Sequence, residues 1–165
     1  MGKSLVIKGA DFSANAIGQN YYPLYVSNYR GVGTSGPGTS PIYPSLSVQQ
    51  HLRGNTLYKV KFYLYTAGVL SLVKSTGSSP SKTAVTIESF TFTQDQVGQE
   101  VEMVLTTPHL VASNEWIGVK QTGDTGGIYY VPSSQNYGDG YWFLSGSSMA
   151  SRTTGDLEMS FYSFG

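Results

Sequence analysis

The alternation of apolar and polar side chains over residues 57–66 constrains the fold more than any other feature of the chain. Val60, Phe62 and Leu64 share one parity. The other parity carries amines and phenols: Lys59, Lys61, Tyr63 and Tyr65. Because successive side chains of a β-strand point to opposite faces, this period of two predicts a strand with one buried face.

The segment that follows predicts a reversal of the chain. Thr66-Ala67-Gly68 has the composition of a short turn, with a glycine where a positive φ is most often needed. Residues 69–73 are then rich in aliphatic and β-branched side chains. We therefore expect residues 57–74 to form a long hairpin whose apolar side is covered by another layer.

From Ser45 onward the pattern is one strand after another, with Gly, Pro, Asn or Asp in nearly every gap. The parity slips near Glu88-Ser89, which predicts a bulge or a corner. No stretch of about eleven residues has a helical period, and strands recur at a spacing of about ten residues. The sequence predicts an all-β fold, an antiparallel, jelly-roll-like β-sandwich. The further strand candidates are residues 83–87, 90–93, 101–105, 115–120, 126–131, 141–144 and 157–161.

Two domain organisations are compatible with the first part of the chain. Residues 5–8 and 22–29 have the composition of extended segments, and residues 31–41 form a Gly/Ser/Pro-rich stretch that suits neither a helix nor a central strand. Residues 1–44 are then an arm that packs on a partner, ahead of a β-sandwich domain at 45–165. Alternatively, residues 1–165 are one domain with a long exposed loop.

The composition narrows the classes of partner. Only 12% of the residues are charged and the formal net charge is +0, which argues against nucleic acid and anionic membranes. The chain has 20 Gly and 13 Tyr and no cysteine, so disulfides and thiolate metal sites are excluded. This composition suits a protein made in a reducing cytoplasm and later exposed on a virion or cell surface.

Neither a targeting signal nor a membrane span is expected. Residues 1–8 contain only a short apolar run, too short for the core of a signal peptide. Nowhere does an apolar run approach the roughly 18 residues of a transmembrane helix. We expect a soluble protein that leaves the cell by lysis or on a larger assembly.

Two short motifs suggest catalysis but lack its context. Asp124-Thr125-Gly126 is the tripeptide of aspartic proteases, yet polar residues precede it and a hairpin turn explains it. Asp11-Phe12-Ser13 resembles the Gly-Asp-Ser of lipase-like hydrolases, but Phe12 splits the pair and no late histidine follows. Neither motif predicts an enzyme.

The ionisable residues predict no metal or cofactor. His51 and His109 have no acidic neighbour at ligand spacing, so we expect both to be solvated. Glu100 and Glu102 share one strand face and are expected to point to water. Three aspartates lie in glycine-containing turns that are compatible with a loop Ca²⁺, although turn chemistry alone explains them. These are Asp124, Asp139 and Asp156.

The aromatic residues between positions 116 and 142 are the best candidates for ligand binding. Flat rings stack on the C–H faces of sugars, and neighbouring amides and carboxylates hydrogen-bond the hydroxyls. The alternative is that these rings fill the core or an oligomer interface, as Trp and Tyr often do. The candidate glycan-binding residues are Trp116, Tyr129, Tyr130, Asn136, Tyr137, Asp139, Tyr141 and Trp142.

Three segments carry a resemblance to a known group of proteins. The opening Lys8-Gly9-Ala10-Asp11-Phe12-Ser13-Ala14-Asn15-Ala16-Ile17-Gly18 resembles a segment of structural and adhesin-type β-sandwich modules of gut Bacteroidales and their phages. Residues 67–72 and 154–161 are similar to the hairpin and closing strand of such modules. The resemblance implies a surface-binding role and no chemistry. Because a Gly-Asp-Ser motif and a late histidine are missing, we expect no esterase domain of the kind that can follow this opening.

Together these features predict a non-enzymatic structural or attachment protein of a phage particle, such as a fibre, tail or capsid-decorating subunit. We expect a homo-oligomer such as a trimer, with other virion proteins and surface polysaccharide as partners. The alternatives are a stand-alone carbohydrate-binding module and, third, a hydrolase with an unrecognised site. Substantial helix, or a polar cleft where Asp124 or a histidine meets another ionisable group, would contradict the passive role.

Overall fold

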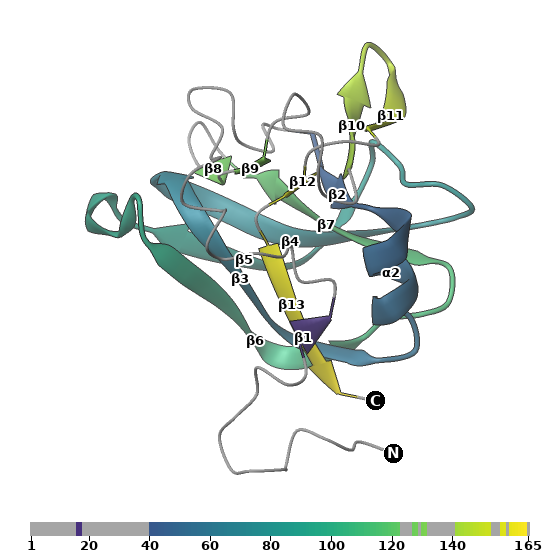
Figure 1. Ribbon diagram of the computed structural model, residues 1–165, viewed down its shortest axis with the longest axis horizontal. Helices are drawn as coiled ribbons and strands as arrows, with labels where there is room; N and C mark the ends of the chain where they lie inside the picture. Colours follow the sequence, from purple (N-terminus) through teal and green to yellow (C-terminus); the bar gives the residue numbers. More distant parts are fainter. Residues whose placement is uncertain are drawn as a thin grey trace.

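The computed structural model describes residues 16–17, 40–122, 127–128, 130–131, 141–152, 156–157 and 159–164. These residues form antiparallel strands that build two main layers (Figure 1), with one short α-helix, α2 (Leu46–Leu52), and one 3₁₀ turn, η2 (Gln94–Gln96). The predicted all-β, sandwich-like class is confirmed. Its jelly-roll connectivity stays a prediction.

The first layer is built on β3 (Thr56–Thr66). The strand order is β1 (Ala16–Ile17), β13 (Met159–Phe164), β3 and β6 (Glu100–Leu110), and β8 (Gly127–Ile128) pairs with the end of β3. Phe62 of β3 lies opposite Met159 on one side and Val101 on the other. The long central strand therefore has neighbours from distant parts of the chain on both sides.

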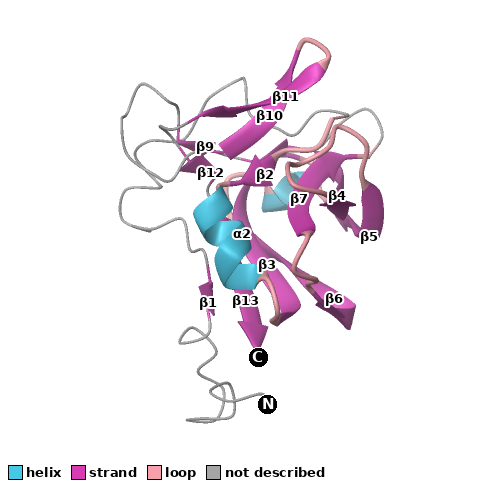
Figure 2. Cartoon of the chain, turned by 90° about the vertical axis from the view of Figure 1, so that its right-hand side faces the viewer, coloured by secondary structure: helices cyan, strands magenta, loops and turns pink. Residues whose placement is uncertain are grey.

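The second layer has the order β5 (Val85–Phe92), β4 (Gly68–Thr76) and β7 (Glu115–Gln121). A bridge between Ile42 and Val119 brings β2 (Tyr43–Pro44) beside β7, and β2 pairs in turn with β10 (Tyr141–Ser145). The hairpin of β10 and β11 (Ser148–Arg152) stands away from the two layers (Figure 2). A further pair joins β9 (Tyr130–Val131) to β12 (Asp156–Leu157).

The core lies between the two layers, and α2 closes one side of it. Along β3 and β6 the predicted alternation is confirmed, since one parity is buried and the other carries the lysines and glutamates. Glu100 and Glu102 are exposed as expected, and they pair with Lys61 and Lys59. The core residues are Val48, Leu52, Leu57, Val60, Phe62, Leu64, Leu70, Leu72, Phe92, Val101, Met103, Leu105, Val111, Ile117, Val119, Ile128, Met159 and Phe161.

The predicted hairpin of residues 57–74 is wrong. Only Ala67 separates β3 from β4, yet the two strands do not pair, because β3 belongs to the first layer and β4 to the second. Gly68, with a φ of 140°, allows the abrupt change of direction. The physical reason is that Leu70, Ser71, Leu72 and Val73 are all buried, so β4 needs cover on both faces as a central strand.

The expectation of strand throughout the region after Ser45 is wrong at α2. Ser45 caps this helix, and its hydroxyl accepts a hydrogen bond from the N–H of Val48 at 3.4 Å. Val48, Gln49 and Leu52 are buried on one face of the helix. Seven residues are too few to show a helical period against neighbouring strands.

The predicted irregularity near Glu88 is confirmed as a bulge in β5. Leu72 of β4 lies opposite Glu88, whereas the next residue, Val73, lies opposite Thr86. Ile87 is therefore the extra residue, and it shifts the parity of the strand. The break that the sequence shows is thus a bend within one strand rather than a boundary between two.

The first part of the chain contributes to both layers where it is described. Residues 16–17 pair with β13, and Tyr43 is fully buried. Residues 1–15 and 18–39, which include the rest of the predicted arm, lie outside the described residues, so the arm stays a prediction. Among the described residues, no helix is long and apolar enough to cross a membrane.

Candidate ligand-binding site

The fold brings Trp116 of β7 and Trp142 of β10 into contact. Their ring centroids are 5.8 Å apart and the rings meet edge to face at 71°. Trp116 is 2% exposed and its indole N–H donates to the carbonyl oxygen of Gly77 at 3.1 Å. Trp142 lies outside it and is partly exposed. Trp116 therefore offers no free face to a ligand and serves as the support on which Trp142 rests.

Tyr43 of β2 connects β7 with β10 and thereby positions Trp142 beside Trp116. On the β10 side of β2, Tyr43 lies opposite Trp142, while its ring covers Gly118 of β7. The Tyr43 hydroxyl donates to the carbonyl oxygen of Ser81 at 2.8 Å. Burial raises the pKa of the Tyr43 phenol, and the hydrogen bond with Ser75 offsets part of that rise. The phenol thus stays neutral, and the role of Tyr43 is structural.

Arg53, at the C-terminal end of α2, completes the site. Its guanidinium carbon lies 5.1 Å from the centroid of the Trp116 ring, within the range of a cation–π contact. Its Nε–H donates to the backbone oxygen of Glu115 at 3.1 Å. No sequence spacing connects Arg53 to the tryptophans, so the sequence analysis missed it. A single arginine after an unrecognised helix carries no signal of its own.

The remaining predicted glycan-binding residues are only partly described. Tyr130 lies in β9 and Tyr141 in β10, where Tyr141 pairs with Pro44, but their side chains are not described. The others lie outside the described residues: Tyr129, Asn136, Tyr137 and Asp139. Of the predicted set, the structure therefore brings together Trp116 and Trp142.

A separate cluster of charges surrounds Glu115. One carboxylate oxygen lies 2.9 Å from Nζ of Lys74, and the other lies 2.8 Å from Nε2 of His109. The N–H of Ala112 donates to the second oxygen at 3.1 Å. The expectation of a solvated His109 is therefore wrong, because the short turn after β6 folds Glu115 back beside it. His51, in contrast, is exposed on α2 as expected.

This cluster keeps Glu115 ionised. Burial alone would raise the pKa of its carboxyl, but the hydrogen bonds from Lys74, His109 and the N–H of Ala112 together lower it below its ordinary value. A histidine beside a carboxylate supplies two of the three members of a catalytic triad, and the third is a nucleophile. Within the described residues, however, Glu115 is the one hydrogen-bond partner of the His109 ring, and no hydroxyl stands beside it as a nucleophile.

The metal and protease interpretations gain no support from the described residues. Within these ranges no three His, Asp or Glu side chains gather as a metal site would require. Asp156 lies in β12 rather than in a turn, which corrects its predicted place. Asp124, like Asp11 and Ser13, lies outside the described residues, so a loop Ca²⁺ and the Asp-Thr-Gly motif stay open.

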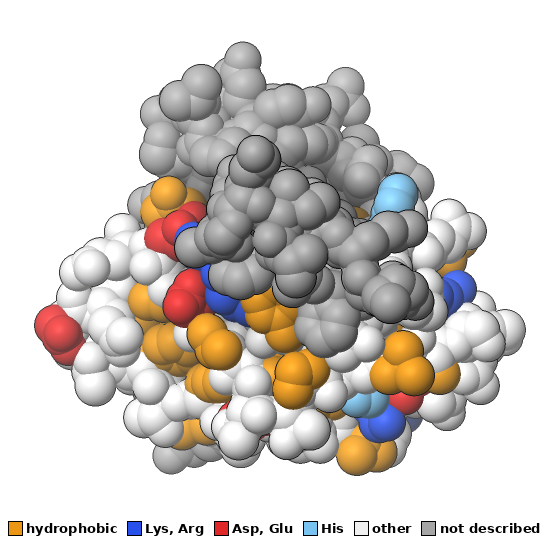
Figure 3. Space-filling view, turned by 90° about the horizontal axis from the view of Figure 1, so that it is seen from below, with side chains coloured by type: hydrophobic (Ala, Val, Ile, Leu, Met, Phe, Trp, Pro, Cys, Tyr) orange, Lys and Arg blue, Asp and Glu red, His pale blue; other side chains and the backbone are white. Residues whose placement is uncertain are grey.

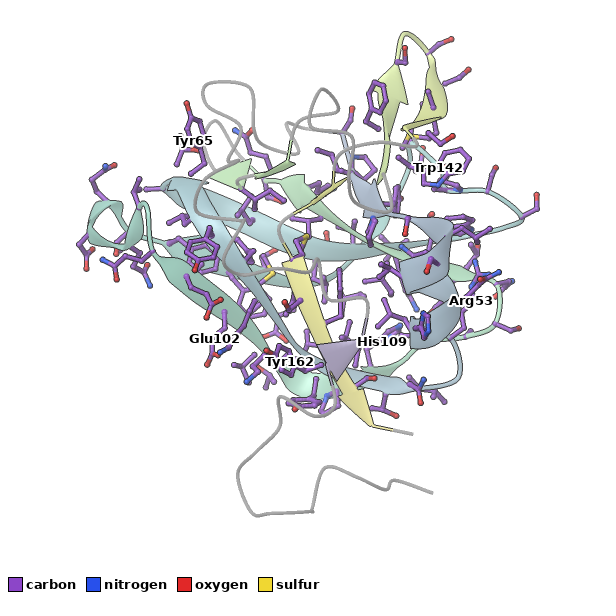
Figure 4. The ribbon with its side chains drawn as sticks, in the orientation of Figure 1. Arg53, Tyr65, Glu102, His109, Trp142 and Tyr162 are labelled. Atoms are coloured by element: carbon purple, nitrogen blue, oxygen red, sulfur yellow. The ribbon has the colours of Figure 1, made fainter. Side chains whose placement is uncertain are left out.

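Comparisons with protein-family models, with curated proteins and with solved structures gave no match to this chain. Function is therefore inferred from the site itself. Its described part is a partly exposed indole, Trp142, held by a buried indole, Trp116, beside the guanidinium of Arg53. Figure 4 shows Arg53 and Trp142 on the same side of the molecule, one at the end of α2 and the other on β10.

Proposed function

We propose that this chain is a non-enzymatic structural or attachment subunit of a phage particle, a fibre, tail or capsid-decorating protein, that binds surface glycan through Trp142. The observation that carries the glycan part is the indole of Trp142, partly exposed and held edge-on by Trp116 at 5.8 Å. A ring fixed in this way loses little conformational freedom when a sugar stacks on it.

The hairpin that carries Trp142 adds hydroxyl groups to the proposed binding surface. The tip of the β10–β11 hairpin carries exposed hydroxyls and a turn at Gly146, with a φ of 63°. Hydroxyls of this kind exchange hydrogen bonds with sugar hydroxyls at little cost in desolvation. The exposed serines of the hairpin are Ser145, Ser147, Ser148 and Ser151.

The surface elsewhere supports assembly into a larger particle. Figure 3 shows a face on which hydrophobic and uncharged side chains are interspersed with several separate groups of acidic and basic side chains. Three large aliphatic side chains on β5 and β6 are more than half exposed: Val85 at 63%, Val104 at 51% and Leu110 at 63%. Exposed aliphatic side chains of this size favour contacts between subunits.

The glycan part is tested on a panel of surface polysaccharides. We expect binding that Trp142→Ala reduces about tenfold or more, because the stacking face is lost. Tyr65→Ala is the matched control, since Tyr65 is a partly exposed aromatic on β3. Both variants should keep the wild-type circular dichroism spectrum. Equal loss in both variants, or wild-type protein that binds none of the panel, contradicts the proposal.

The particle part is tested by the mass of the protein in solution. Size-exclusion chromatography with light scattering should show a stable homo-oligomer such as a trimer. A strict monomer that still binds glycan would favour the alternative, a stand-alone carbohydrate-binding module.

One observation bears on the third alternative, a hydrolase. His109 does meet an ionisable group, Glu115, although among the described residues no hydroxyl is hydrogen-bonded to the His109 ring. If the pair were catalytic, His109→Gln would abolish a turnover that wild-type protein shows on ester or glycoside substrates. We expect no such turnover in either protein.

A further inference from the structure

We infer that the ligand of this site is an acidic saccharide whose carboxylate is bound by Arg53 while its ring stacks on Trp142. This inference rests on the proposed glycan binding and adds the chemical class of the sugar. The guanidinium carbon of Arg53 and the ring of Trp142 lie 5.1 Å and 5.8 Å, respectively, from the centroid of the same Trp116 ring. A cation and a stacking surface are thus held by one buried side chain.

The charge of Arg53 is not neutralised within the described structure. Its contact with Glu115 is to the backbone oxygen, whereas the carboxylate of Glu115 is shared by Lys74 and His109. In the ranges that the structure describes, no carboxylate lies within ion-pair distance of the Arg53 guanidinium. In contrast, Lys59 and Lys61 both have glutamate partners on β6. An arginine placed beside a binding surface without an acid is available to an anionic ligand.

Within the described part of the chain, the one side-chain hydrogen bond of Arg53 uses Nε and leaves the two terminal nitrogens of the guanidinium available to a ligand. Nε–H is directed at Glu115, so one N–H from each terminal nitrogen remains as a parallel pair of donors. This pair matches the two oxygens of a carboxylate. The contact with Trp116 and the bond to Glu115 fix the guanidinium before the ligand arrives, which reduces the entropy lost on binding.

The rest of the molecule argues against a more highly charged ligand. The formal net charge is +0 and Arg53 is the one cation recorded at the Trp116–Trp142 pair among the described residues. A polyphosphate or nucleic acid requires several cations along its backbone. A sugar with one carboxylate per residue, as in a uronic acid polymer, requires one guanidinium for each bound ring.

The test compares polymers that differ mainly in the acid group. Full-length wild-type protein is titrated with a polyuronate, with the same polymer after reduction of its carboxyls to alcohols, and with a sulfated neutral glycan. Arg53→Gln removes the charge, and Arg53→Lys keeps the charge but loses the planar fork. Lys82→Gln is the control for net charge, because Lys82 is an exposed lysine on the loop after β4.

We expect wild-type protein to bind the polyuronate about tenfold more tightly than its reduced form, with an affinity that falls as salt is added. Arg53→Gln should lose that preference, Arg53→Lys should recover only part of it, and Lys82→Gln should behave as wild type. Trp142→Ala should weaken binding to both polymers.

Several outcomes overturn the inference. Equal binding of the polyuronate and its reduced form, or an unchanged preference in Arg53→Gln, removes Arg53 as the acid-binding group but leaves glycan binding intact. Tighter binding of the sulfated glycan than of the polyuronate rejects a carboxylate as the ligand group. Binding to none of the three polymers rejects the inference together with the proposed function.

Discussion

Gly118 lies within β7, where the space that a β-carbon would need is already occupied. A β-carbon built at this position would lie 2.6 Å from Cδ1 of Tyr43 and 2.7 Å from the backbone oxygen of Ile42. The backbone oxygen is held by the bridge to Val119 and has little freedom to move. Only glycine fits at position 118, because Tyr43 and the backbone of Ile42 approach it so closely. The position of Tyr43, and with it that of Trp142, therefore depends on this glycine.

Gly118→Ala should destabilise the protein by about 1–3 kcal/mol, because the added methyl group overpacks the contact between β7 and Tyr43. Thermal unfolding followed by circular dichroism measures the change. Thr91→Ala, at an exposed position of β5, is the control and should shift the midpoint little. A midpoint for Gly118→Ala equal to that of the wild type would show that Tyr43 moves aside freely.

At the scale of elements, α2 lies along the free edge of β7 and side chains from it hydrogen-bond the backbone groups that a neighbouring strand would otherwise pair. The side-chain amide of fully buried Gln49 donates to the carbonyl oxygen of Ile117 at 2.8 Å, and its oxygen accepts from the N–H of Ile117 at 2.9 Å. The side chain of Arg53 donates a hydrogen bond to the backbone oxygen of Glu115. The backbones of Ile42 and Val119 exchange two hydrogen bonds. Alternate residues of this edge are thus paired by two side chains and one bridge.

Gln49→Glu should cost about 2 kcal/mol at neutral pH, because a carboxylate oxygen then faces the carbonyl oxygen of Ile117. Burial and this repulsion raise the folded pKa of the new carboxyl above its unfolded value of about 4.3. The deficit relative to wild type should therefore shrink as the pH falls through the folded pKa, and reach its minimum below the unfolded one. Urea unfolding at several pH values measures it.

The control is Gln50→Glu, which introduces the same charge at an exposed neighbouring position. It should have little effect at any of these pH values. A constant deficit for Gln49→Glu between neutral and acidic pH would contradict the pairing of Gln49 with Ile117.

Much of this arrangement could be predicted from the sequence, but only where one face of a strand is buried. The parity of Val60 and Met103 follows from alternation alone, and so does the bulge near Glu88. Alternation fixes which face of a strand is buried and carries no information about its neighbours. Residues 57–74 therefore predicted a hairpin, although β3 and β4 pair with strands elsewhere.

The candidate site shows the same limit. An aromatic cluster was predicted from residues 116–142, and Trp116 and Trp142 do meet. That Trp116 is the buried member and Arg53 its neighbour depends on Tyr43 and α2, which come from a part of the chain with no visible period. The contact of His109 with Glu115 likewise depends on a turn whose geometry the spacing does not reveal.

At the scale of the molecule, the cluster around Glu115 joins the two layers. His109 comes from β6 in the first layer, and Lys74 and Glu115 come from β4 and β7 in the second. Because the folded pKa of Glu115 lies below its ordinary value of 4.5, its contribution to stability is complete above that value. The contribution is lost as the pH falls through the lower, folded pKa.

Glu115→Gln should lower the free energy of unfolding at neutral pH by about 1–3 kcal/mol, because Lys74 and His109 lose their shared anion. The difference from wild type should shrink once the pH falls below 4.5 and through the folded pKa of Glu115. Urea unfolding across this range measures it. Glu102→Gln, which breaks an exposed pair with Lys59, should cost less than about 1 kcal/mol. Equal effects of the two substitutions would show that the cluster adds nothing beyond a surface ion pair.

The single-residue crossing at Ala67 has a consequence for how the protein is made. Two neighbouring strands of the chain, β3 and β4, thus enter different layers, while β13, which pairs with β3, follows only after all the other numbered strands. During translation, β3 emerges from the ribosome before β13, so the backbone groups along one edge of β3 stay open to chaperones or to other nascent chains. We therefore expect the first layer to be completed only after β13 has left the exit tunnel.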